Sequence, residues 1–310
     1  MPKKEHGEKS TTITSIEKQI KDEIVKLSKL RGNTRCYPLL LTGVLIRDPL
    51  VDDVYDDLRT AYADDTDCLE VVVDSGGGDI DATYNLALLF RRFGRKRLTF
   101  IVPRWAKSAA TLLVCAGDNI LMTPVAELGP LDPQITAMNP LEGRMEEFSP
   151  LHIESTLTLI REEYKNGHKD LADGLLKRLQ FPLTLGSFKK SLELGNQYLV
   201  NLLSSRMLKD NIDLANSIGK QLTEGYADHT FCIDVQEAQR IGLKAEELGG
   251  KELDIIWDVH RLVRKKRELE QAQKKRELRK RIKELPPELL EKLPEDLLRG
   301  IEKEQRKPLR

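Results

Sequence analysis

Apolar positions along the chain follow two patterns, short uninterrupted runs and stripes with helical spacing. Uninterrupted runs are typical of buried strands, whereas apolar residues three or four positions apart line one face of a helix. The runs predict strands over Tyr37–Leu45, Leu69–Val73, Leu98–Val102 and Asn119–Met122. The stripes predict helices over Ile13–Leu30, Leu50–Ala63, Ile80–Phe93, Ala106–Ala116, Pro150–Leu179, Gly186–Leu208 and Asn211–Gly225. Strands without polar alternation, separated by helices, indicate parallel β-α-β units that are covered on both faces.

The two ends of the chain differ from this middle part. Residues 1–12 are predicted to be disordered, and from about Leu253 the chain becomes basic and low in aromatic residues. Arg261–Lys283 carries twelve Lys/Arg against three Glu, and two segments beginning Leu-Pro then form a small imperfect helical repeat. We therefore expect an N-terminal tail and amphipathic helix over 1–34, an α/β domain over 35–252 and a basic helical extension over 253–310.

Composition narrows the class of protein. The 310 residues carry no net charge, so the molecule as a whole is not an obvious nucleic-acid binder. The four cysteines are scattered without a C-x-x-C pair, which argues against a zinc site or a disulfide framework. The N-terminus lacks the apolar core of a secretory signal, and the longest apolar run is too short to span a membrane. We expect a soluble, cytoplasmic protein without metal or cofactor, since no His/Asp/Glu cluster has metal-ligand spacing.

Two turns that follow predicted strands are candidate ligand sites, because ligands bind outside the carboxyl ends of the strands in open parallel sheets. The first, Asp74–Asp79, reads DSGGGD, and its glycines permit positive φ and close approach of N–H groups to an anion. It lacks the G-K-[ST] of a P-loop, and G-x-G-x-x-G fails at its last glycine. The turn is therefore either a plain tight turn or part of an anion-binding site.

The second turn holds Ser108 at the start of a predicted helix. Serine at this position is most often a helix cap. Yet Ala106, Ala109 and Ala110 are small and leave space around the hydroxyl. The N–H of Ala109 and one from the glycine turn can converge on a developing oxyanion. Ser108 is therefore a candidate nucleophile as well as a candidate cap.

At these residues the sequence resembles the serine dehydrogenase proteinase family of the Clp/crotonase fold, which is related to signal peptide peptidase A and to the caseinolytic (Clp) protease. The resemblance covers roughly Tyr37 to Gly249 and is strongest over Val71–Gln134. The segments that carry it are VVVDSGGGDI, AKSAATLLVCAGDNILM, AELGPLDPQ and YADHTFCIDVQEAQRIGL. It implies repeated ββα and βαβ units with a mostly parallel sheet, to which the helical N-terminal and C-terminal parts are appended.

The resemblance also implies roles for particular residues. In these relatives a glycine turn supplies an oxyanion donor, and a serine on the following unit attacks the peptide carbonyl. Carried over by position, Ser108 is the nucleophile, and Gly77 and Ala109 supply the oxyanion N–H groups. Gly76 stands where the relatives commonly have proline, from which we expect a looser turn that keeps its donor.

A serine hydroxyl needs a general base, normally a histidine or a lysine. Clp-type enzymes have a histidine shortly after the nucleophile, but the corresponding segment here, LMTPVAELGP, contains none. Signal peptide peptidases use Ser-Lys instead. Lys169 in NGHKD and Lys189 or Lys190 in GSFKKSLELGNQYLVNLL are the candidates, and Lys190 is preferred.

Other polar residues near these motifs have competing interpretations. His229 in GYADHTF is a second candidate base, and it can also bind substrate or cap a turn. Lys107 adjoins Ser108 in sequence, so its side chain is expected to point elsewhere. Glu127 and Asp132 sit beside Gly-Pro and Asp-Pro steps and are interpreted as parts of a shaped turn that lines the cleft.

Three functions are compatible with the sequence. A serine peptidase uses Ser108, whereas a crotonase-like acyl-CoA enzyme uses the same oxyanion turn with a carboxylate such as Glu127 and needs no serine. A non-catalytic scaffold uses the basic segment to bind nucleic acid, an acidic protein or a membrane surface. The peptidase is the preferred hypothesis, with a protein or peptide as substrate. The resemblance implies an oligomeric ring, and the amphipathic Ile13–Leu30 and the tail are candidate oligomer contacts.

Overall fold

The computed structural model describes residues 12–41, 43–61, 67–131, 135–139, 144–148, 150–178 and 185–284. The predicted disorder before residue 12, Asp132 and the imperfect repeat after residue 284 lie outside these ranges. The chain divides into two compact units. One consists of Met1–Lys21 and Arg261–Arg310, and the other is Asp22–His260.

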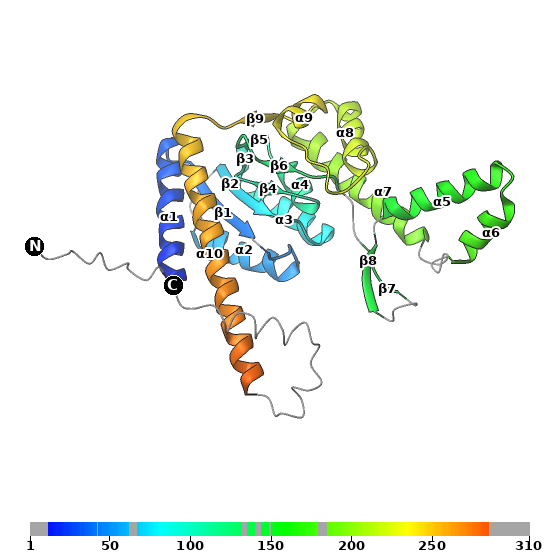
Figure 1. Cartoon of the computed structure of the whole chain (residues 1–310). Coiled ribbons are helices and arrows are strands. Elements are labelled where there is room, and N and C mark those ends of the chain that lie inside the picture. Colours follow the sequence, from blue (N-terminus) through cyan, green and yellow to red (C-terminus); the bar gives the residue numbers. More distant parts are fainter. Residues whose placement is uncertain are drawn as a thin grey trace, which may run out of the picture. The chain divides into compact units, whose positions relative to one another are not determined.

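A seven-stranded sheet forms the centre of the larger unit (Figure 1). Its strands are β1 (Arg35–Leu41), β2 (Cys68–Ser75), β3 (Arg97–Val102), β4 (Trp105–Ala106), β5 (Asn119–Met122), β6 (Glu127–Leu128) and β9 (Ala245–Glu247). They lie in the order β6-β4-β2-β3-β5-β9, with β1 also paired to β2. Every pairing in this sheet is parallel, which confirms the predicted mostly parallel α/β class.

The helices also follow the predicted periodicity closely. They are α1 (Ile13–Leu30), α2 (Asp48–Ala61), α3 (Ile80–Phe93), α4 (Ala109–Val114), α5 (Pro150–Lys165), α6 (Lys169–Arg178), α7 (Leu185–Leu202), α8 (Ile212–Glu224), α9 (Val235–Arg240) and α10 (Gly250–Lys283). The predicted helix over 150–179 is broken into α5 and α6 near Gly167, whose φ of 90° lies in the left-handed region. The predicted end of the helix over 186–208 is a π-helical turn, Leu203–Met207.

Three short strands and a hairpin have no counterpart in the predicted elements. The strands β4, β6 and β9 contain only two or three residues each, so no period-two pattern marks them. The predicted helix start at Ala106 is wrong, because this residue pairs with Ser75 in the sheet and α4 begins at Ala109. A separate antiparallel pair, β7 (Ile135–Asn139) with β8 (Arg144–Phe148), lies between β6 and β9 in the sequence.

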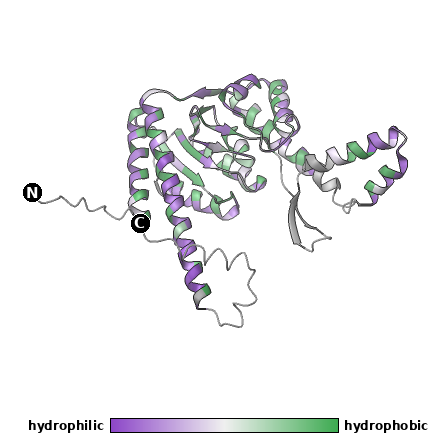
Figure 2. Ribbon diagram, viewed as in Figure 1, coloured by the Kyte–Doolittle hydropathy of each residue, from purple (hydrophilic) through white to green (hydrophobic). Residues whose placement is uncertain are grey.

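The core of the larger unit is apolar and continuous. Val71, Val73, Phe100 and Val102 on the central strands are fully buried. Figure 2 shows these strands as predominantly hydrophobic, whereas the C-terminal part of α10 is predominantly hydrophilic. Burying residues on both faces of the strands explains why the sequence shows continuous apolar runs and no alternation.

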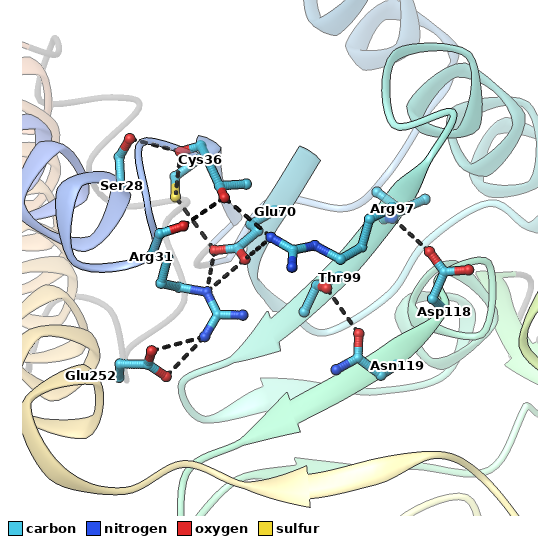
Figure 3. Close-up of polar contacts among 11 residues, drawn as sticks. Ser28, Arg31, Cys36, Glu70, Arg97, Thr99, Asp118, Asn119 and Glu252 are labelled. Atoms are coloured by element: carbon cyan, nitrogen blue, oxygen red, sulfur yellow. Dashed lines mark hydrogen bonds and ion pairs between the residues drawn. The ribbon is translucent and has the colours of Figure 1, made fainter. Parts of the chain in front are cut away.

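A buried polar network joins the start of β2 to Arg31, which directly follows α1, and to α10 (Figure 3). The fully buried Glu70 accepts hydrogen bonds of 2.6 Å from Arg31, whose guanidinium also donates at 2.9 Å to Glu252 of α10. Burial disfavours the charge of Arg31, but its contacts with Glu70 and Glu252 outweigh that cost and raise the pKa of Arg31. Burial, reinforced by Glu70, raises the pKa of the neighbouring Cys36 thiol to about 12.

The smaller unit contains the N-terminal half of α1 and most of α10. Within it, Lys266 Nζ lies 2.7 Å from Glu17 Oε1. This contact lowers the pKa of the exposed Glu17 carboxyl, with the Lys266 hydrogen bond as the largest cause. Among the helices of the described residues, none is long and apolar enough to cross a membrane.

Candidate active site at the ends of two strands

The glycine turn follows directly on β2 and has a shape that only glycine adopts without strain. Gly77 and Gly78 have φ angles of 106° and 155°. A Cβ on Gly77 would lie 2.7 Å from the carbonyl oxygen of Lys107 and 3.0 Å from the Cβ of Ser108. On Gly78 it would run into the backbone of Ile46, to which this turn is hydrogen-bonded. A Cβ on Gly76 would meet nothing within 4 Å.

Ser108 occupies a sharp turn between β4 and α4. Its φ of 51° and ψ of −124° are outside the usual regions for a residue with a side chain. It stands at the N-cap position of α4, but its side chain makes no capping hydrogen bond. The interpretation of Ser108 as a helix cap is therefore wrong. A strained serine on a strand-to-helix turn is the arrangement in which a nucleophilic hydroxyl is held out from the backbone.

Ser75 fixes the two turns to one another. Its carbonyl oxygen accepts the N–H of Lys107 at 3.1 Å, and its hydroxyl accepts the N–H of Gly77, also at 3.1 Å. Ser75 also pairs with Ala106 in the sheet register. These bonds place the glycine turn against Ser108, as the parallel sheet predicts for adjacent strand ends.

The two predicted oxyanion donors differ in their present bonding. The Ala109 N–H, in the first turn of α4, has no acceptor among the residues that the structure describes. The Gly77 N–H is donated to Ser75 instead. Both groups lie beside Ser108, because a Cβ on Gly77 would be 3.1 Å from the nitrogen of Ala109.

Lys107 points away from its neighbour Ser108, as expected. Its Nζ lies 2.8 Å from Glu127 Oε2 and donates at 3.1 Å to the carbonyl of Leu128. Arg104 donates to the same carboxylate at 2.6 Å. Burial by itself would raise the pKa of Glu127, but the bonds from Lys107 and Arg104 outweigh it and lower that pKa. Glu127 is thus held as a carboxylate by two cations, and sequence reasoning did not foresee this ion-pair cluster.

The contacts of the candidate bases can be compared with the position of the nucleophile. Lys190 is exposed on α7, and His229 is half-exposed with its Nδ1 3.8 Å from Asp228 Oδ1. Lys169 is exposed at the start of α6, with its Nζ 5.5 Å from the centre of the Tyr164 ring. Within the described part of the chain, no hydrogen bond or ion pair connects any of these three groups to Ser108. The side chain of Lys189 lies outside the described residues.

Sequence comparison finds relatives without an established function. Two uncharacterized proteins of Methanocaldococcus jannaschii match this chain. One is 24% identical over 176 residues, which are 57% of this chain and 51% of the relative. The other is 25% identical over 193 residues, which are 62% of this chain and 58% of the relative. The chain thus spans little more than half the length of the curated relatives it matches.

Solved protease structures are distantly similar to this chain. A mutant of the 1510-N membrane-bound stomatin-specific protease gives a TM-score of 0.45 at 14% identity, covering 70% of this chain and 81% of that one. A mutant of ClpP1 from Listeria monocytogenes gives 0.40 at 14% identity, covering 74% of this chain and 99% of that one. The match to a family model is more specific than these likenesses. Residues 41–149, which include the glycine turn and Ser108, match the model of a family described as ClpP-like SDH-type serine proteinase.

Proposed function

We propose that this protein is a serine peptidase in which Ser108 is the nucleophile. The observation that carries the proposal is the conformation of Ser108, whose φ of 51° belongs to a turn that packs against Gly77. Its hydroxyl is not used as a helix cap. A strained backbone costs about 1–3 kcal/mol and persists where the surroundings hold it, commonly at functional sites. The match of residues 41–149 to a serine proteinase family supports the same chemistry.

In this proposal the Ser108 oxygen attacks the carbonyl carbon of a peptide bond while a base takes its proton. The resulting tetrahedral oxyanion is stabilised by N–H donors at the strand ends. Ala109 supplies the first donor, since its N–H has no acceptor in the described structure. Gly77 supplies the second after sharing or releasing its bond to Ser75, and the N–H of Gly78 is the alternative. The same base then protonates the leaving amine.

For the base we propose Lys190 first and His229 second. Lys190 lies on α7, and Gly195 of that helix packs near Leu131 and Ile80, the first residue after the glycine turn. Lys190 is thus about one and a half turns from a contact with the site, at 3.6 residues per turn. Lys169 and Lys189 are the remaining alternatives. A base that approaches only with bound substrate is consistent with the looser hydrogen bonds of unliganded sites.

A fluorophosphonate probe tests the nucleophile. The wild type is expected to form one adduct, which peptide mapping assigns to Ser108, and Ser108→Ala is expected to lose both adduct and peptide hydrolysis while keeping the far-UV circular dichroism spectrum. An adduct at another serine contradicts the proposal. Single Lys190→Met, His229→Gln, Lys169→Met and Lys189→Met variants then identify the base, because loss of a general base lowers the rate by about 10²–10⁴-fold.

The acyl-CoA alternative requires a carboxylate that is free to move protons. Glu127 is instead bound by Lys107 and Arg104, which lower its pKa. A carboxylate held in this way is a weak base. Isothermal calorimetry with an acyl-CoA is expected to give no binding heat, and saturable binding that disappears in Glu127→Ala would favour this second function.

Quaternary and cellular properties are further parts of the proposal. We propose that a homo-oligomer shelters the site, that the protein works in the cytoplasm, and that the chain is organised as the 1–34, 35–252 and 253–310 parts. The basic residues of 261–283 form a helix that can bind an acidic partner or nucleic acid. Light scattering measures the assembly, and the salt dependence of binding to an RNA oligonucleotide tests the basic segment.

A further inference from the structure

A second buried carboxylate lies at the far end of β2 from Glu70. Asp74 is 1% exposed and immediately precedes Ser75 and the glycine turn. Among the described residues its side chain has one hydrogen-bond partner, the Nδ1 of His260, at 3.3 Å. The partner comes from α10, 186 positions further along the chain. A buried carboxylate depends strongly on such a partner, because removing it leaves an uncompensated charge.

His260 itself is 8% exposed and sits between the two tryptophans of the chain. The Trp257 ring stacks on it with a centroid distance of 4.9 Å, and the Trp105 ring meets it edge-on at 6.2 Å. Trp105 belongs to β4, the strand that leads into Lys107 and Ser108. His260 therefore contacts the second-to-last residue of each of the two strands that lead into the candidate site.

Ser75 connects these contacts to the site. It follows Asp74 in the chain, and its two oxygen atoms accept the N–H groups of Gly77 and Lys107. A displacement of Asp74 consequently moves the shared acceptor of both turns. A displacement of about 1 Å in a catalytic group is enough to lower a rate by about a hundredfold.

We propose that His260 is a positioning residue for the Ser108 site, which it holds in place through Asp74, Ser75 and Trp105. An ionised carboxylate only accepts hydrogen bonds, so Nδ1 of His260 carries the proton in this contact. The Trp257 and Trp105 rings fix the plane of the imidazole and direct Nδ1 toward Asp74. The catalytic consequence rests on the proposed function, whereas the positional one does not.

Three substitutions separate the hydrogen bond from simple packing. His260→Asn places an amide donor near the former Nδ1 and keeps the bond to Asp74. His260→Gln is also a neutral amide but places its donor one methylene further out, and His260→Phe keeps an aromatic ring without a donor. Arg281→Gln removes the exposed 2.9 Å pair with Glu277 on the same helix and serves as the matched control.

Hydrogen–deuterium exchange measured by mass spectrometry on the peptides spanning residues 74–79 and 104–109 gives the positional readout. We expect exchange in both peptides to accelerate about tenfold or more in His260→Phe and His260→Gln, because their amides open more readily. His260→Asn and Arg281→Gln are expected to stay near the wild-type rate. If His260→Phe does not fold, the comparison of Asn with Gln decides by itself.

The catalytic readout is the rate of fluorophosphonate labelling at Ser108. The labelling rate is expected to fall about 10–100-fold in the Gln and Phe variants and to recover in the Asn variant. In peptide hydrolysis, kcat is expected to change more than KM in the same variants. The inference is overturned if both peptides exchange at the wild-type rate in the folded Gln or Phe variant. It is also overturned if the Asn variant exchanges as fast as the Gln variant. If the wild type is not labelled at Ser108, the proposed function is wrong, and the exchange measurement still decides the role of His260.

Discussion

The two ends of β2 each carry a buried carboxylate, but they are satisfied very differently. Glu70, at the start, is bonded by Arg31 through two short contacts, and Arg97 lies 3.6 Å from one of its oxygens. Asp74, at the end, has one hydrogen-bond contact among the described residues, with His260 at 3.3 Å. Several contacts hold the carboxylate at the start of the strand, whereas one contact in the described structure holds the carboxylate at its end. Where few bonds hold a buried group, one substitution changes its position, and that end is the one that carries the candidate site.

The largest expected effect is at the anchored end. Replacing Arg31 with Ala leaves Glu70 buried without its main partner, which costs about 3–5 kcal/mol of unfolding free energy. Urea denaturation followed by circular dichroism measures the loss. The control is Arg59→Ala, which removes an exposed pair with Asp56 and is expected to cost less than about 1 kcal/mol. Equal losses in the two variants would contradict the anchor role of Glu70.

The next largest loss of stability is expected in the glycine turn, where substitutions test how tightly the end of β2 is packed. Gly78→Ala places a Cβ against the Ile46 backbone at a positive φ, and Gly77→Ala places one against Lys107. We expect each to lose about 2–4 kcal/mol, since overpacking and backbone strain both contribute. Gly76→Ala meets open space and is the matched control, expected within about 0.5 kcal/mol of the wild type. Thermal unfolding measures the stability of the three variants. A large loss in Gly76→Ala would show that the turn differs from this description.

A smaller effect, with the opposite sign, is expected at the serine itself. Ser108→Gly should be about 1 kcal/mol more stable than Ser108→Ala, because glycine adopts a φ of 51° without the penalty of a Cβ. Both variants lack the hydroxyl, so the comparison isolates the backbone strain. Denaturant midpoints at equal m-values measure it. An alanine variant as stable as the glycine variant would mean that Ser108 is not strained.

The smallest effect concerns the ion-pair cluster behind Ser108. The pKa of Glu127 is lower in the folded protein than its ordinary value of 4.5, so its contribution to stability is present above about pH 4.5 and is lost as pH falls through the folded pKa. Glu127→Gln should therefore reduce stability at pH 7 by less than about 1 kcal/mol and reduce it less at pH 3. Denaturation at both pH values checks this. A deficit that is larger at pH 3 would have the wrong sign.

The sequence predicted the elements that have their own periodicity. The helices Ile13–Leu30 and Ile80–Phe93 and the strand Asn119–Met122 have the predicted bounds, because the apolar residues of each follow the period or the unbroken run typical of its element. Asp234 caps α9 by accepting the N–H of Glu237 at 2.8 Å. The two-residue strands β4 and β6 have no such signal, since they are too short to show a period and are defined by their pairing with neighbouring strands.

Residue types and their spacing determined by themselves that a parallel sheet forms, that a glycine turn ends β2, and that Ser108 follows the next long strand within a run of small residues. They did so because hydrophobic periodicity and glycine geometry are local properties. Only the tertiary structure decided the left-handed φ of Ser108, the tether of Lys107 to Glu127, and the contact of His260 with Asp74. These depend on groups brought together across as many as 186 positions, where sequence carries no local trace of which side chains will meet.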